Sequence, residues 1–222
     1  MTWTAAIIVS AKRGPLVAEI IVPAVAACLP DQLLLVGEGA FANTSMHLGS
    51  LEPTKFNYLF VPPMTHSTND ALVKRDVAAL ACTSEWIAYF SDDHKPAPDF
   101  GKQMRLLTGW QLGERLRRCT EVDVYVPARY ASQPGHEGER LNNGEGTTAE
   151  SMIGNQSVGN YCGGHAGVYR KSLIERFPWS AGPHDREWDL LNSRRHMEAG
   201  ARYCWTDALK VFDCEPDAEP WK

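Results

Sequence analysis

The segment from Trp86 to His94, WIAYFSDDH, indicates the fold class of this chain. Its residues Trp86 to Phe90 are apolar without interruption, which is typical of a β-strand buried on both faces of a sheet. The strand stops at Ser91, and two adjacent carboxylates, Asp92 and Asp93, follow it. Because ligands of parallel α/β sheets bind at the carboxyl ends of the strands, this segment predicts a buried parallel strand that ends at a binding site.

Three further apolar runs precede this segment, and helical patterns separate them. Pro23 lies inside the first helical pattern and is expected to kink or split that helix. Alternating strands and helices predict a mostly parallel α/β sheet with helices on its faces. The predicted strands are Ala5–Val9, Leu33–Val36 and Asn57–Val61, and the predicted helices are Leu16–Cys28 and Asp70–Cys82.

The second half of the chain has shorter elements. Residues Ala131–Gly159 are rich in Gly, Ser, Asn and Glu, and a loop this long is expected to close over a ligand. No repeat or linker is visible, so we predict one domain over residues 1–222. The predicted helices here are Phe100–Arg118, Lys171–Phe177 and Asp185–Ala199, and the predicted strands are Val122–Val126, Tyr203–Trp205 and Ala208–Phe212. Residues Gly163–Tyr169 are predicted to be a Gly-rich turn that enters a further strand.

Composition excludes several classes of protein. The 222 residues carry a formal net charge of −5, so the overall charge gives no argument for nucleic-acid binding. No segment approaches the roughly 20 apolar residues of a membrane span, and the N-terminus lacks the basic start of a signal peptide. The six cysteines form no Cys-x-x-Cys pair. These features predict a cytoplasmic protein with reduced thiols and no membrane partner.

The two carboxylates after the Trp86 strand suggest a metal site. Asp92 and Asp93 repel each other unless a positive charge lies nearby. Mg²⁺ or Mn²⁺ would supply that charge, and such a cation binds carboxylate and phosphate oxygens together. His94 is then a candidate neighbour of the metal or of a phosphate. The alternative is a solvated turn in which one aspartate caps the next helix.

A second acidic cluster lies at the start of the helix predicted over residues 185–199. Asp185 is placed to cap this helix, and carboxylates in a first turn also complement the helix dipole. That explanation accounts less well for Glu187 and Asp189, which flank Trp188. A carboxylate held near a hydroxyl group can instead act as a general base.

Four cations, Lys12, Arg13, Lys74 and Arg75, could neutralise a nucleotide diphosphate, although a solvated helix face is the more common position for each of them taken singly. Residues Gly37–Ala42 match the dinucleotide pattern Gly-x-Gly-x-x-Gly/Ala, but a loop-like segment follows instead of a helix. A nicotinamide enzyme is therefore not favoured.

Together these segments resemble the GT-A fold glycosyltransferases, especially the large family 2 type, along nearly the whole chain. Residues Ser10–Arg13 resemble the family's first nucleotide contact. Val36–Gly39 stands where the family has Val-Asp-Asp-Gly, so Glu38 matches the acidic residue that contacts the base. The segment Asn69–Asp76, which contains Arg75, resembles the Arg-Asn segment that opens the helix before the signature strand.

The WIAYFSDD segment resembles the strand and Asp-x-Asp metal motif of this family, with Ser91 in the place of the first Asp and Asp93 as the metal ligand. Residues Cys162–Leu173 resemble the Gly-rich acceptor segment, and Glu187–Leu190 resembles the acidic catalytic motif. Asp213 stands where many relatives carry a third metal ligand, often a His. The resemblance implies these site residues: catalytic Glu187 and Asp189; metal-binding Asp92, Asp93 and Asp213; donor-binding Ser10, Arg13, Glu38, Arg75, Ser91 and Asp92; acceptor-binding Gly163, Gly164 and His165.

The resemblance implies a Mn²⁺- or Mg²⁺-dependent glycosyltransferase. Residues 1–100 would bind a UDP- or GDP-sugar, and residues 101–222 would bind the acceptor. A Glu187 base implies inversion at the sugar carbon, and no protein partner is expected. The alternatives are a nucleotidyltransferase of related fold and a non-catalytic module that binds nucleotide sugars or glycans.

The acceptor stays open among a soluble glycan, a protein side chain and a hydroxymethylated DNA base. Compact transferases of phage-type modification systems resemble this chain in size. Basic residues gather in the second half, namely Arg115, Arg117, Arg118, Arg129, Arg140, Arg170, Lys171, Arg194 and Arg195. Scattered solvated arginines would explain them equally well.

Overall fold

The predicted parallel strands form one side of the central sheet. The computed structural model describes residues 2–9, 16–38, 57–62, 67–108, 122–130, 138, 166–182 and 188–214, without the side chains of residues 38, 67–70 and 188–190. Strand β1 (Trp3–Ile8) pairs in parallel with β2 (Gln32–Glu38) and β4 (Trp86–Ser91), and β3 (Asn57–Val61) pairs in parallel with β2. Every residue of β1 and β4 is buried, which explains why both sequences are apolar almost without alternation.

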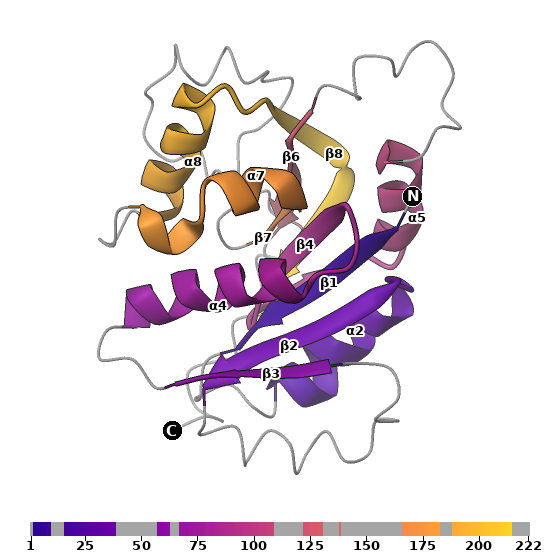
Figure 1. Ribbon diagram of the computed structural model, residues 1–222. Coiled ribbons are helices and arrows are strands. Elements are labelled where there is room, and N and C mark those ends of the chain that lie inside the picture. The colour runs from indigo at the N-terminus through magenta and orange to yellow at the C-terminus, as the bar shows by residue number, and fades with distance from the viewer. Residues whose placement is uncertain are drawn as a thin grey trace.

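The second half of the chain extends the same sheet (Figure 1). Strand β7 (Ala166–Arg170) is antiparallel to β4 and to β6 (Val124–Tyr130). Strand β8 (Tyr203–Asp213) is parallel to β6, and the short strand β5 (His94–Pro96) is antiparallel to β8. The described strands are ordered β3-β2-β1-β4-β7-β6-β8-β5. Both halves of the sequence therefore contribute to one mixed sheet.

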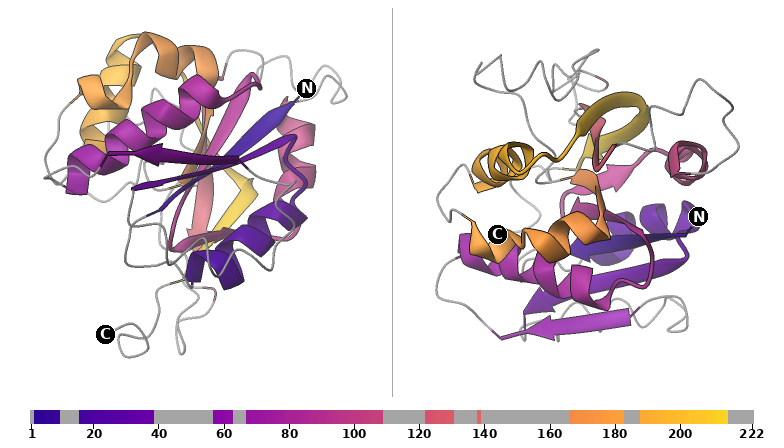
Figure 2. Two further views of the ribbon diagram at one scale, coloured as in Figure 1. Left: turned by 60° about the horizontal axis from the view of Figure 1, so that its bottom comes forward. Right: turned by 45° about the horizontal axis from the view of Figure 1, so that its top comes forward.

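Helices cover both faces of this sheet (Figures 1 and 2). On one face lie η1 (Val17–Ile21), a π-helical segment, with α2 (Val22–Ala27) and α5 (Phe100–Thr108). On the other face lie α4 (Ser67–Ala81), α7 (Lys171–Arg176), the 3₁₀ turn η5 (Trp179–Ala181) and α8 (Trp188–Glu198). This arrangement confirms the α/β class that the sequence predicts.

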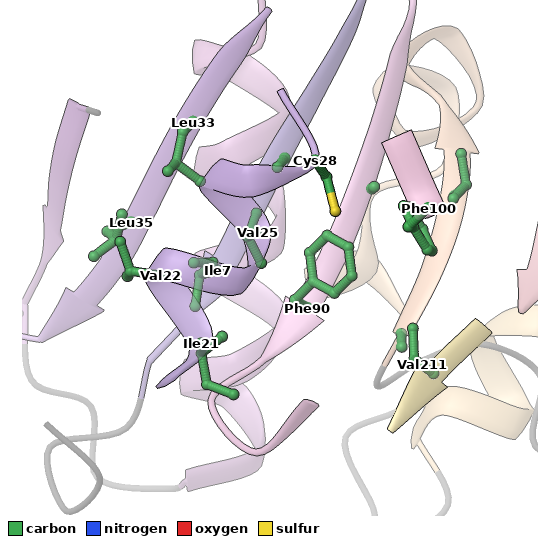
Figure 3. Packing of buried hydrophobic residues seen from close by; sticks show 14 of the residues in the cluster. Ile7, Ile21, Val22, Val25, Cys28, Leu33, Leu35, Phe90, Phe100 and Val211 are labelled. Atoms are coloured by element: carbon green, nitrogen blue, oxygen red, sulfur yellow. The ribbon is translucent and has the colours of Figure 1, made fainter. Parts of the chain in front are cut away.

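Alternate residues of the central strands belong to two separate cores. Ile7 of β1 faces the α2 and α5 side, whereas Ile8 faces the α4 side, because successive side chains of a strand point to opposite faces. Figure 3 shows the first core, in which Val25 of α2 packs near Phe90 of β4, and Phe100 of α5 completes the layer. The Phe90 and Phe100 rings meet edge to face, with centroids 5.3 Å apart.

Several elements differ from the sequence prediction. The helix predicted around Pro23 changes type instead of ending, because the π-helical residues Val17–Ile21 run directly into α2, whose second residue is Pro23. Proline has no N–H to donate to a regular α-helical hydrogen bond, which is consistent with an irregular turn just before it. Strand β5 was not predicted, and the two predicted terminal strands are one strand, β8. Residues 109–121, predicted as the end of a helix, and the predicted loop from 131 to 159, apart from Gly138, lie outside the described residues.

An irregularity between β6 and β8 explains the break that the sequence suggests at Thr206. Pro127 pairs with Thr206, but the next residue, Ala128, pairs with Lys210. Three residues of β8 therefore bulge out, after which Arg129 pairs with Val211. This shift places Arg129 two residues from Asp213 along the strand ladder.

No helix among the described residues is long and apolar enough to cross a membrane.

Candidate active site

The carboxyl ends of several parallel strands meet at one edge of the sheet. Ile8 at the end of β1 pairs with Val36 of β2 and with Ser91 at the end of β4. Strand β7 pairs with both β4 and β6, so these two strands run level and end at the same edge. Asp213 ends β8, which is parallel to β6. The sheet thus gathers the ends of β1, β2, β4, β6 and β8 where ligands of α/β sheets bind.

A tight turn at Asp92 and Asp93 reverses the chain into β5. Strand β4 ends at Ser91, and β5 begins only three residues later, at His94. His94 is then paired with Asp213 in the antiparallel β5–β8 ladder. The backbone N–H of Cys214 donates a hydrogen bond of 2.5 Å to the carbonyl of Asp93. The last strand is therefore fastened to the turn that carries the predicted metal ligands.

The side chains at this junction form a connected charge cluster, made of Asp93, His94, Asp213 and Arg129. His94 Nδ1 lies 2.5 Å from Oδ1 of Asp93, and its Nε2 lies 3.0 Å from Oδ1 of Asp213. Arg129 donates from Nε to Oδ1 of Asp213 at 2.6 Å and from Nη2 to Oδ2 at 2.5 Å. The exposed fraction of the side chain is 1% for His94, 8% for Asp213, 18% for Arg129 and 20% for Asp93.

Burial and charge act in opposite directions on this cluster. Burial alone would lower the pKa of His94, but its contacts with Asp213 and Asp93 outweigh burial and raise that pKa. Burial alone would raise the pKa of Asp213, but His94 and Arg129 outweigh it and lower that pKa. Asp213 is thus held as a carboxylate by two groups that favour its charged form.

The carboxylate oxygens of the cluster are suitable ligands for a divalent cation, but they are already engaged by His94 and Arg129. Carboxylate oxygens are the ligands that Mn²⁺ and Mg²⁺ prefer, and Asp92, Asp93 and Asp213 provide them at one edge of the sheet. Within the described ranges, no three His, Cys, Asp or Glu side chains are arranged to hold a metal ion. Instead, Asp93 contacts His94, and Asp213 contacts both His94 and Arg129.

The two predicted cations of α4 are buried. Lys74 is 1% exposed, and its Nζ donates to the carbonyl of Val9 at 2.8 Å, directly after the end of β1. Arg75, also 1% exposed, lies over the Tyr89 and Trp179 rings, 5.9 and 6.0 Å from their centroids. Arg75 therefore packs in the core between α4 and the sheet. Of the two cations, Lys74 is the one that reaches the end of β1. A donor-binding role for Arg75 stays a prediction.

Other predicted residues lie at or beyond the limits of the described chain. Ser10, Arg13 and Glu187 fall outside it, and so do the predicted acceptor residues Gly163, Gly164 and His165. Ala166, which follows His165, pairs with Phe90 near this edge of the sheet. Glu38 is the last residue of β2, and Asp189 lies in the first turn of α8. Their backbone positions are described, but their side chains are not.

Two members of the charge cluster were not among the predicted site residues. The sequence indicates His94 only as a neighbour of a metal or phosphate, through its position directly after two aspartates. In the sequence, Arg129 is only one of several basic residues of the second half. Its contact with Asp213 spans 84 residues of sequence and depends on the β6–β8 register, so no local pattern could reveal it.

Comparison with known proteins identifies the fold. No protein-family model matches the sequence, and no curated protein is significantly similar to it. Among solved structures, S. aureus TarS 1–349 in complex with UDP-GlcNAc aligns with 98% of this chain at 14% identity and a TM-score of 0.65. The mannosyltransferase PcManGT from Pyrobaculum calidifontis, in complex with GDP-Man and Mn²⁺, aligns with 97% at 12% identity and a TM-score of 0.62.

These similarities show that the chain has the GT-A glycosyltransferase fold, as the sequence resemblance implies. The chain spans about 60% of the length of the TarS 1–349 structure and 58% of that of PcManGT.

Proposed function

We propose that this protein is a glycosyltransferase that moves a sugar from a nucleoside diphosphate sugar to an acceptor hydroxyl. The observation that carries the proposal is the gathering of Asp92, Asp93 and Asp213 at one edge of a GT-A sheet, where β1, β2 and β4 also end. Structures of the same fold bind UDP-GlcNAc or GDP-Man, which supports a nucleotide-sugar donor.

The donor would lie along the ends of β1, β2 and β4. Ser10 and Arg13 follow β1 directly, and Glu38 ends β2, so these residues are placed in the chain to contact the nucleoside. Ser91 ends β4 beside them and Asp92 follows it, and the two residues are 9% and 7% exposed, respectively. The buried ammonium group of Lys74 lies at the end of β1, where it would attract the negatively charged diphosphate.

A divalent cation would be held by Asp93 and Asp213, with Asp92 next to them. When bound, Mn²⁺ or Mg²⁺ neutralises the diphosphate that leaves. The complex of PcManGT with Mn²⁺ supports this role for a metal in the same fold. The acidic side chains have a second task that needs no metal, because they tie β4, β5 and β8 together through His94.

Glu187 would accept the proton of the acceptor hydroxyl, with Asp189 as the other candidate. Glu187 directly precedes α8, and Asp189 lies in its first turn. A single displacement assisted by such a base inverts the sugar carbon, so we propose an inverting reaction.

The contacts of the basic residues do not single out a nucleic-acid acceptor. Arg129 is bonded to Asp213, and Arg170 is bonded to Glu85 and to the carbonyl of Val122. Lys171 donates to the carbonyl of Cys82, and Arg195 donates to those of Phe177 and Pro178. These side chains bind within the protein, so glycans, proteins and DNA remain equal candidates.

A product assay distinguishes the three functions that the sequence leaves open. UDP- and GDP-sugars with Mn²⁺ are incubated with the protein and a panel of glycan, peptide and DNA acceptors. A glycosyltransferase releases nucleoside diphosphate as the acceptor gains a sugar. In a parallel incubation with sugar phosphate and nucleoside triphosphate, release of pyrophosphate would instead identify a nucleotidyltransferase. Donor binding without any product would identify a binding module.

A further inference from the structure

Both carboxylate oxygens of Asp213 are engaged by one guanidinium group. Arg129 forms a two-pronged contact, Nε to Oδ1 at 2.6 Å and Nη2 to Oδ2 at 2.5 Å. His94 Nε2 lies 3.0 Å from the same Oδ1. A bidentate arginine–carboxylate contact is among the stronger polar contacts in proteins. The residue that should share a cation with Asp93 is therefore already bound to a cationic side chain.

Because the contact between Arg129 and Asp213 is mostly buried, it strongly affects an incoming metal ion. The Asp213 and Arg129 side chains are only 8% and 18% exposed, so salt screens their interaction less than it would on the surface. A divalent cation that approaches Asp213 meets the positive charge of Arg129 at close range. It must either displace the guanidinium or share the carboxylate with it at a cost in repulsion.

We propose that Arg129 keeps Asp213 closed to the divalent cation until the donor diphosphate binds and takes over Arg129. This inference rests on the proposed function, because the cation and the diphosphate both belong to it. A guanidinium group fits phosphate oxygens as well as it fits a carboxylate. When the diphosphate binds, Arg129 can therefore exchange the Asp213 carboxylate for phosphate oxygens, which leaves Asp213 able to bind the metal. Cation and donor then bind together rather than independently.

The opposite role for Arg129 makes an opposite prediction. If Arg129 only orients Asp213 as a supporting partner of a metal ligand, its removal should weaken metal binding, by about 10- to 100-fold for such partners. If Arg129 competes with the metal, its removal should tighten metal binding. The sign of the change decides between the two roles.

The test is calorimetric titration of the full chain with Mn²⁺ alone, without nucleotide. We expect Arg129→Gln to bind Mn²⁺ about tenfold more tightly than the unaltered protein, which lies in the usual range of coupling between two bound groups. Arg129→Lys should fall between them, because an ammonium group cannot span both oxygens. Arg105→Gln is the matched control and should bind Mn²⁺ as the unaltered protein does. Arg105 is exposed on α5 and donates to the Leu29 carbonyl, just before the amino end of β2.

A second titration adds uridine diphosphate. We expect it to strengthen Mn²⁺ binding more in the unaltered protein than in Arg129→Gln, in which there is no guanidinium to displace. Circular dichroism and thermal melting establish whether each variant is folded. If Arg129→Gln does not fold, the Mn²⁺ affinity of Arg129→Lys tests the inference in its place.

Equal or weaker Mn²⁺ binding by the folded Arg129 variants would overturn the inference, even if the protein transfers sugar. Tighter Mn²⁺ binding in a protein that releases no nucleoside diphosphate from any sugar would support the inference and contradict the proposed function. The two proposals can therefore fail separately.

Discussion

At the scale of single residues, the carboxylates of the proposed site have different surroundings and different tasks. Asp213 is bound by Arg129 and His94, which lower its pKa, whereas Asp93 contacts Nδ1 of His94. Glu187 and Asp189 belong to another element and are assigned to the proton of the acceptor. A substitution that removes charge but keeps shape can separate these tasks, because an amide neither accepts a proton at neutral pH nor balances a cation.

We expect Glu187→Gln to keep its donor affinity and thermal stability but to lose turnover. The amide is almost the same shape as the carboxylate and lacks only the ability to accept a proton. General-base catalysis contributes about 10²- to 10⁴-fold, so the turnover number with saturating acceptor should fall within that range. Steady-state kinetics and donor calorimetry measure the two effects.

Asp189→Asn is the comparison for this variant. A greater loss of turnover in Asp189→Asn would transfer the role of base to Asp189. Normal turnover in Glu187→Gln, or a collapse of its melting temperature, would show that Glu187 has no catalytic role or a structural one.

The elements show where local sequence patterns suffice and where they do not. Strands β1, β2 and β4 are predictable because they are buried on both faces, and mostly apolar residues fill such positions. Strand β5 is not predictable in the same way. Its three residues, His94 to Pro96, form a strand only because β8 lies beside them. The charge cluster depends on this pairing, so the sequence indicates its aspartates but not the arginine that binds one of them.

The packing of α5 against α2 predicts the effect of a methyl group at Gly101. A Cβ atom there would lie 1.8 Å from the carbonyl oxygen of Cys28, a backbone atom at the end of α2. We expect Gly101→Ala to lower the free energy of unfolding by about 1–3 kcal/mol because the helices must separate. Urea denaturation measures this change.

Helix propensity alone predicts the opposite sign for Gly101→Ala, a gain of up to about 1 kcal/mol. Lys102→Ala, at an exposed position of the same helix, is the control and should change stability little. A Gly101→Ala variant more stable than the unaltered protein would disprove the close approach of α5 to α2.

Helix α8 carries a buried histidine that predicts a pH dependence of stability. Burial lowers the pKa of His196 to about 4, although a contact with the Phe177 carbonyl opposes the shift, and Arg195 adds to it. In the unfolded chain this imidazole has a pKa near 6.5. The neutral buried form therefore stabilises the fold above about pH 6.5, and this stability is lost as the pH falls towards 4, by roughly 3 kcal/mol in total.

The difference between the unaltered protein and His196→Gln isolates this effect, with the free energy of unfolding measured from pH 7 to pH 4. His94 is present in both proteins, so any contribution of its raised pKa cancels in this difference. NMR titration of the His196 ring provides a direct check. Identical pH profiles for the two proteins, or a His196 ring that titrates near 6.5, would contradict the prediction.

At the scale of the whole molecule, the predicted α/β order is confirmed across both halves, and the GT-A fold is shown by the solved structures it matches. In residues 1–100 the strands alternate with helices, and strands joined by a helical crossover run parallel. The parallel part of the sheet is therefore predictable from the sequence pattern. The placement of β6, β7 and β8 depends on antiparallel pairing between distant segments, such as Val124 with Tyr169. Those pairings bring Asp213 to the strand ends, which no single segment predicts.

The most direct test of the central claim is donor binding and turnover in Asp93→Asn. Nucleoside diphosphate release and metal-dependent donor affinity are measured for this variant, for the unaltered protein and for Asp31→Asn. Asp31 is exposed, accepts a hydrogen bond from the Trp3 N–H and lies at the amino end of β2, the opposite edge of the sheet. We predict that Asp31→Asn transfers sugar normally. Asp93→Asn should lose transfer and nearly all metal-dependent donor binding, a loss of several kcal/mol of the order expected for metal catalysis. Near-normal transfer by a folded Asp93→Asn variant, or full activity of the unaltered protein in excess chelator, would contradict the account.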